Sequence, residues 1–213
     1  MSTRHAPPPR RTARLQPQRR IIQLLTEGRR TEVEYFAEWA KEFRDRLTIE
    51  FDPVHGSPMT LVNRAVEKVD QRRRVMRRGK GEAEFDEIWC VFDHDEHPFV
   101  NEALALAAQH EIGVAFSNPC FELWFVLHAQ ELRRHTDRHR MQGLSAQLGL
   151  TAGKGLVDGI WDQMRAQWKQ ADARSVVLDT MHRQNGSPPR SNPSTSVGRL
   201  VNQLHEAANS SVR

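Results

Sequence analysis

The chain has 213 residues, with 31 Lys and Arg against 27 Asp and Glu and 38% hydrophobic residues. It is long enough to bury a core, and its mild basic excess is compatible with an anionic partner. The two cysteines exclude a disulfide framework and a four-cysteine zinc site. The apolar runs are too short for a membrane span, and the N-terminal segment has no apolar stretch like that of a secretory signal. Both features favour a cytoplasmic protein that does not enter membranes.

Residues 1–19 are rich in proline and arginine, which predicts a disordered basic arm, either a solvated tail or a tether for nucleic acid. Strand and helix patterns then alternate over residues 20–130. Apolar or alternating runs predict strands near residues 21–25, 47–54, 87–92 and 114–116. Helical spacing follows each strand, near residues 31–43, 59–78, 100–109 and 120–129. Four such repeats predict an α/β domain with a mostly parallel, four-stranded sheet flanked by helices.

The pattern after residue 130 is helical, near residues 144–150, 156–168, 171–182 and 195–208. We therefore expect residues 131–213 to form a helical C-terminal region packed on the α/β domain. Two local features also carry predictions. Thr31 and Glu34 have the spacing of a capping box. The arginines between Arg72 and Arg78 end a helix, where they complement its dipole or contact phosphate.

Three acidic residues occupy predicted strand ends. Glu27 follows the first strand, and Asp93 and Asp95 follow the apolar run at residues 87–92. Parallel sheets bind ligands beyond the carboxyl ends of their strands, so these carboxylates could converge. Clustered carboxylates repel one another, and a divalent cation relieves that repulsion. Their hard oxygens favour Mg²⁺ or Mn²⁺. Such a metal can activate water and stabilise charge on a phosphoryl group.

The sequence Leu25-Thr26-Glu27-Gly28, followed later by Val91-Phe92-Asp93-His94-Asp95, resembles the Toprim arrangement. A fuller resemblance is to the RloB family, a Toprim-related group encoded near bacterial restriction and abortive-infection loci. Four blocks in the same order carry it, namely residues 27–36, 92–98, 117–124 and 192–197. Together they extend over most of residues 20–207.

The resemblance implies a Toprim-like fold and a metal-dependent nuclease core. It maps Glu27, Asp93 and Asp95 onto the acidic residues that hold Mg²⁺. It also implies a role in phage defence beside a partner ATPase of the AbiL type. His94, Glu96 and His97 depart from the general Toprim pattern, and their role is left open.

Further candidates come from the residues themselves. Glu122 lies in an apolar helix start, which indicates either a metal-binding or catalytic carboxylate or an ordinary first-turn acid capped by Asn118. Arg29 and Arg30 could clamp a phosphate or pair with Glu32 and Glu34. Lys154, between two glycines, is either a phosphate contact or a loop lysine without a specific task.

Two functions follow. The first is a Mg²⁺-dependent nuclease acting on DNA or RNA, with Glu27, Asp93, Asp95 and Glu122 at its centre and Arg30 and Lys154 contacting phosphate. The alternative is a non-catalytic nucleic-acid-binding or sensor subunit of a defence complex. The sequence leaves open whether the chain forms a homo-oligomer.

Overall fold

Alternating strands and helices build a single five-stranded sheet. The structure, a computed structural model, describes residues 19–79, 84–94, 97–153 and 155–210. The strand order is β2-β1-β3-β4-β7, and the first four strands are parallel. These strands are β1 (Arg20–Thr26), β2 (Leu47–Phe51), β3 (Glu87–Asp93), β4 (Gly113–Asn118) and β7 (Ser194–Thr195). The predicted α/β class with a mostly parallel sheet is confirmed.

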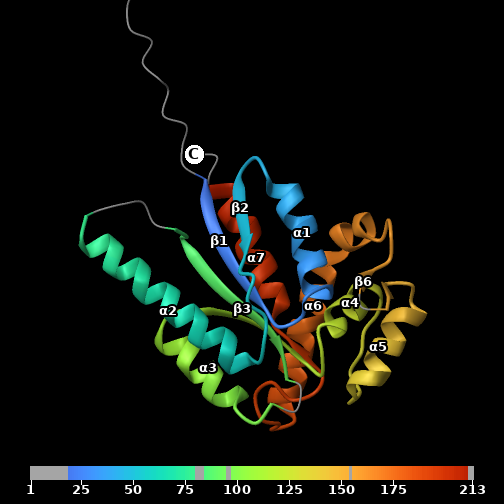
Figure 1. The fold of residues 1–213 in the computed structure, drawn as a ribbon. Coiled ribbons are helices and arrows are strands. Elements are labelled where there is room, and N and C mark those ends of the chain that lie inside the picture. The colour runs from blue at the N-terminus through green and yellow to red at the C-terminus, as the bar shows by residue number, and fades with distance from the viewer. Residues whose placement is uncertain (1–18, 80–83, 95–96, 154, 211–213) are drawn as a thin grey trace, which may run out of the picture.

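Helices cover both faces of the sheet (Figure 1). One face packs against α2 (Pro58–Arg77) and α3 (Val100–Gln109). Helices α1 (Thr31–Phe43), α4 (Glu122–Ala129), α6 (Trp161–Gln184) and α7 (Val197–Ser210) belong to the core on the other face. Covering on both faces explains why β3 has a nearly continuous apolar sequence. None of the described helices combines the length and hydropathy required to cross a bilayer.

The C-terminal region differs from its prediction in three respects. It contributes strand β7, which pairs antiparallel with the end of β4, so the sheet has five strands rather than four. It also contains a hairpin of β5 (Thr151–Ala152) and β6 (Gly155–Leu156), near α5 (Arg138–Gln147). The helices predicted at residues 156–168 and 171–182 are the single helix α6. Two-residue strands carry too little hydrophobic pattern to be recognised in a sequence.

Residues of β7 attach the C-terminal region to the sheet by side-chain as well as backbone contacts. The hydroxyl groups of Ser117 and Thr195 lie 2.9 Å apart in a buried hydrogen bond. Ser196 accepts a hydrogen bond from the backbone N–H of Phe116, and its own N–H donates to the Phe116 carbonyl. Helix α7 then buries an apolar stripe beneath the sheet. The α/β part and the C-terminal region thus share one core.

Candidate functional site

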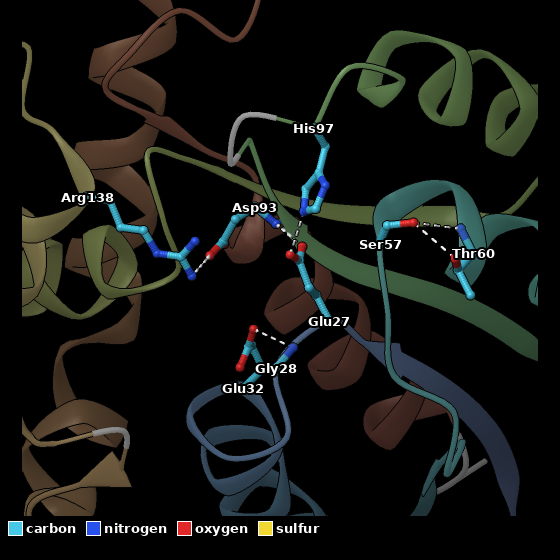
Figure 2. A network of polar contacts seen from close by, with 8 residues as sticks. All are labelled: Glu27, Gly28, Glu32, Ser57, Thr60, Asp93, His97 and Arg138. Carbon is cyan, nitrogen blue, oxygen red and sulfur yellow. Dashed lines mark hydrogen bonds and ion pairs between the residues drawn. The ribbon is translucent and has the colours of Figure 1, made fainter.

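The carboxyl ends of β1 and β3 bring two predicted site residues together. The two strands are parallel neighbours, with Thr26 aligned to Val91. Glu27 therefore lies beside the end of β3, where its Oε2 accepts a hydrogen bond of 3.1 Å from the backbone N–H of Asp93 (Figure 2). Residues 66 positions apart in the sequence meet because parallel strands end at the same edge of a sheet.

His97 is a further contact of Glu27. His97 follows β3 and precedes α3, and its Nε2 lies 3.0 Å from Oε1 of Glu27 (Figure 2). Both oxygens of Glu27 thus have partners, one from the backbone of Asp93 and one from an imidazole. Together these contacts fix the orientation of the carboxylate.

Asp93 is the most constrained acid of the site. Its residue is 5% exposed, and its Oδ2 lies 3.9 Å from a guanidinium nitrogen of Arg138. Its buried Oδ1 has no hydrogen-bond partner among the described residues. Burial raises the pKa of Asp93 well above the ordinary value, and the charges of Glu32, Glu27 and Glu122 raise it further, against the opposing effect of Arg138. An unpartnered buried oxygen among like charges is a position that a cation would stabilise.

Glu32 was not predicted as a site residue. It is buried near the start of α1, and its Oε1 accepts a hydrogen bond of 3.1 Å from the backbone N–H of Gly28 (Figure 2). Burial raises the pKa of Glu32, with smaller contributions from the charges of Glu122 and Glu27. Gly28 is required here because a Cβ would collide with the Glu32 carboxylate. The proposed capping box is wrong, since the helix N-cap is Arg30 and makes no side-chain capping bond.

Three helices begin at this site. Glu32 lies in the first turn of α1, Glu122 is the first residue of α4, and Arg138 is the first residue of α5. Asp137 caps α5 by accepting a hydrogen bond from the N–H of Arg140, which positions the helix start that carries Arg138. The positive ends of helix dipoles stabilise carboxylates and attract anions such as phosphate.

The site opens into a cavity of about 360 Å³. Its acidic lining consists of Glu32, Asp93 and Glu122, and its basic lining of Arg29, Arg30 and Arg138. Arg29 and Arg30 are exposed, whereas the three acids are buried. The cavity thus has carboxylates in its interior and guanidinium groups toward solvent. Such a surface can hold a cation inside and a phosphate outside.

Arg30 also forms an ion pair with Glu34, which the sequence analysis gave as the alternative to a phosphate contact. Its Nε lies 3.1 Å from Oε1 of Glu34, and the other oxygen of Glu34 accepts a hydrogen bond from the N–H of Leu156 in β6. The Arg30 side chain is nevertheless 64% exposed, so its guanidinium group can still reach a ligand in the cavity.

Two predicted site residues, Asp95 and Lys154, lie outside the described residues. Within the part of the chain that is described, no three acid, histidine or cysteine side chains gather into a preformed metal site. The oxygen donors of Glu27 and Asp93 nevertheless suit a hard cation, and the unpartnered Oδ1 of Asp93 offers one free ligand position.

The sequence analysis missed the positions of Glu32, His97 and Arg138 in this site. The sequence held a signal for Glu32, since a residue four positions after Gly28 at a helix start can reach back to its N–H. No local pattern indicates that Arg138, 45 residues after Asp93, would lie beside it. That contact depends on the packing of α5 against α4.

Comparison with known proteins agrees with the resemblance. The model of the RloB-like protein family matches residues 22–204. Searches among curated proteins and among solved structures gave no match. The matched range contains every described residue of the candidate site, and the chain belongs to the RloB-like family.

Proposed function

We propose that this RloB-like chain is a metal-dependent phosphodiesterase that cleaves DNA or RNA at the cavity beside Asp93. The observation that carries the proposal is the buried Asp93 Oδ1, which has no hydrogen-bond partner within residues 19–79, 84–94, 97–153 and 155–210 although Glu27, Glu32 and Glu122 surround it with negative charge. Proteins rarely retain such a group without a ligand or a catalytic role.

Glu27 and Asp93 would hold Mg²⁺ or Mn²⁺, together with Asp95, which the Toprim resemblance adds to the pair. When bound, the metal supplies Lewis acidity that activates water and offsets charge on a phosphoryl group. Glu122 lines the same cavity and could hold a proton or a water molecule there. The hydrogen bond from His97 holds the Glu27 carboxylate in place.

The arginines explain why the substrate would be a phosphodiester. Arg29, Arg30 and Arg138 line the mouth of an otherwise acidic cavity, and guanidinium groups bind phosphate oxygens in pairs. Lys154, which the sequence analysis named as a phosphate contact and which lies outside the described residues, would add a further one. A substrate backbone lying across the mouth would place its phosphate between these arginines and the acids.

Cleavage of supercoiled DNA and of bulk tRNA in Mg²⁺ tests the proposal. Asp93→Asn and Glu27→Gln should lower the rate by about 100-fold or more, the usual cost of removing one preorganised electrostatic group. Glu42→Gln is the matched control, because Glu42 is an exposed residue of α1 that pairs with Arg165 outside the cavity. Equal cleavage by the unsubstituted chain and both site variants would refute the proposal.

Metal binding can be measured separately from cleavage. A ligand that binds only the folded state raises the melting temperature. Mg²⁺ should therefore stabilise the unsubstituted chain and the Glu42→Gln variant, but not Asp93→Asn. If Mg²⁺ and Mn²⁺ leave the melting temperature of the unsubstituted chain unchanged, the metal site is wrong.

The family resemblance also suggests the cellular location, the biological role and the partner of this activity. We place this activity in the bacterial cytoplasm, in phage defence, with an ATPase of the AbiL type as partner. Co-expression of the chain with an AbiL-type ATPase encoded beside it should give a complex that survives size-exclusion chromatography. Two separate elution peaks would argue against this partner.

A second function is favoured by the exposed end of α2. Arg74, Arg77 and Arg78 are exposed, and none has an ion-pair partner among the described residues. This patch could bind nucleic acid without cleavage. Salt-dependent binding that persists in EDTA and is lost in a variant with all three changed to Gln would support a binding subunit, provided that no substrate is cleaved in Mg²⁺.

A further inference from the structure

A second and larger cavity, of about 850 Å³, lies away from the acidic site. It is lined by residues of α3, the edge of β4, the end of α6 and the segment that joins α6 to α7. Strand β7 pairs only with Ser117 and Asn118 of β4, so the earlier part of that edge borders the cavity instead of another described strand. This volume lies in the range of small-molecule sites.

The sheet edge that borders this second cavity carries apolar side chains on both of its faces. Trp89 of β3 lies on the face that α7 covers, and the opposite face carries four more, namely Leu104 of α3, Ile112 of the α3–β4 loop, and Val114 and Phe116 of β4. Gly113 leaves room for the Trp89 indole, because a Cβ at this position would collide with that ring. The Trp89 indole beside Gly113 forms the apolar wall of the cavity, which suits a flat heterocyclic ring.

The opposite rim of the second cavity is basic. Arg183 at the end of α6, Arg190 in the connecting segment and Arg199 in α7 all line it and are exposed. In the described part of the chain, no carboxylate lies within 4.0 Å of these guanidinium groups. The Arg190 carbonyl accepts a 2.8 Å hydrogen bond from Asn118, which holds the segment to the end of β4. The Arg183 guanidinium donates hydrogen bonds to the Asp179 carbonyl and the Thr180 hydroxyl within α6. With no carboxylate in ion-pair contact, three guanidinium groups on one rim can bind a polyphosphate.

Two polar groups lie between the apolar wall and the basic rim. Ser194 is 2% exposed, and its Oγ has no hydrogen-bond partner among the described residues. Asp179 of α6 lines the same cavity. A buried hydroxyl without a partner indicates a polar ligand atom nearby, and a carboxylate can accept a hydrogen bond from a sugar hydroxyl.

We propose that this second cavity binds a free nucleoside triphosphate. The base would lie on the Trp89 indole beside Gly113, the phosphates on Arg183, Arg190 and Arg199, and the sugar or base edge near Ser194 and Asp179. The arginines cluster at one rim, and a single indole offers a stacking surface for a single base. Both features favour a mononucleotide over a nucleic-acid strand.

Binding of ATP and GTP, followed by calorimetry and tryptophan fluorescence, tests this assignment. All titrations contain EDTA, so that the proposed metal site does not contribute. We expect both nucleotides to bind, with adenosine and pyrophosphate each at least about tenfold weaker, because each retains only half of the contacts. No measurable binding of either nucleotide would overturn the proposal, as would a single-stranded oligonucleotide that binds more tightly than ATP.

Variants connect binding to the cavity. Arg190→Gln and Arg199→Gln should each weaken ATP binding by about tenfold, and Arg165→Gln, an exposed α6 arginine paired with Glu42 and outside the cavity, should leave it unchanged. Ser194→Ala should weaken binding without lowering the melting temperature. Equal affinity in all variants would refute the site. Unchanged affinity in Asp93→Asn would show that ATP does not bind at the acidic cavity, whereas loss of binding in that variant would contradict the proposal.

Discussion

At the scale of single residues, the position of Asp93 favours metal binding but lowers the stability of the folded chain. As the last residue of β3 it is buried, and a buried carboxylate beside three other acids destabilises the folded chain in the absence of a cation. The same arrangement would preorganise a metal ligand. Functional sites commonly retain residues that lower stability in this way.

Replacement of Asp93 by Asn should therefore stabilise the metal-free protein. The variant removes a buried charge that Glu32, Glu27 and Glu122 repel, and it keeps the size of the side chain. A gain of about 1 kcal/mol would raise the melting temperature by about 2–4 °C for a chain of this length. Calorimetry in EDTA at pH 7 measures it. A lower melting temperature would show that the ion pair with Arg138 outweighs the repulsion.

The buried side chain of His128 should make the folded chain less stable at acid pH. Its ring is buried in α4, where Nδ1 lies 2.8 Å from the Trp124 carbonyl, and burial lowers its pKa to about 4. In the unfolded chain the ordinary value is about 6.5. As the pH falls, the unfolded state therefore binds the proton before the folded state does. The contribution of His128 to the free energy of unfolding is fully present above pH 6.5, and it falls by up to about 3 kcal/mol as the pH drops toward 4.

Replacement of His128 by Phe should flatten that acid dependence, because the ring remains without a titrating nitrogen. His139→Gln, at an exposed position, should keep the full slope. Denaturant unfolding between pH 4 and 7 compares the three proteins. A variant slope equal to that of the unsubstituted chain would assign the acid sensitivity to other groups.

At the scale of elements, the meeting of Glu27 with Asp93 could be predicted because it depends only on two apolar strands and their parallel order. The position of Glu32 had a local signal that was missed, its spacing of four from Gly28 at a helix start. The position of Arg138 could not be predicted, since it depends on the packing of α5 against α4. Strand β7 was missed for another reason. Its residues Ser194 and Thr195 are polar, and their burial arises from pairing with β4 rather than from local hydrophobicity.

The turn between β1 and α1 gives a prediction at this scale. Gly28→Ala should displace the Glu32 carboxylate, because the new Cβ occupies its position. The displaced group is the end of a flexible side chain, so the fold should survive while cleavage falls by about tenfold or more. Gly143→Ala, at a helical glycine whose Cβ would meet no neighbour, is the control. Unchanged cleavage in Gly28→Ala would remove Glu32 from the site.

At the scale of the whole molecule, the sequence predicted an α/β domain with a helical C-terminal region packed on it, and the structure joins the two parts through β7 and α7. Helix α7 buries six aliphatic residues against the sheet and its neighbouring helices, namely Val197, Leu200, Val201, Leu204, Ala207 and Ala208. The aromatic ring of His205 stacks on Trp168 of α6 and contacts Trp39 of α1 edge to face. The two regions should therefore unfold together.

A chain that stops after Pro193 tests this expectation. Loss of the apolar contacts of α7 costs on the order of 10 kcal/mol, which is comparable to the entire stability of a domain. We expect the shortened chain to lack a cooperative thermal transition. A chain that stops after Ser210 keeps α7 and should melt like the full chain. A cooperative transition in the shorter chain would instead show that the chain up to Pro193 folds without β7 and α7.

The late position of β7 and α7 also has a consequence for biosynthesis. These segments leave the ribosome after every other described element, yet the edge of β4 and one face of the sheet require them. A nascent chain therefore cannot complete this core before β7 and α7 have been synthesised. The candidate site would gain its full structural support only after synthesis of this segment.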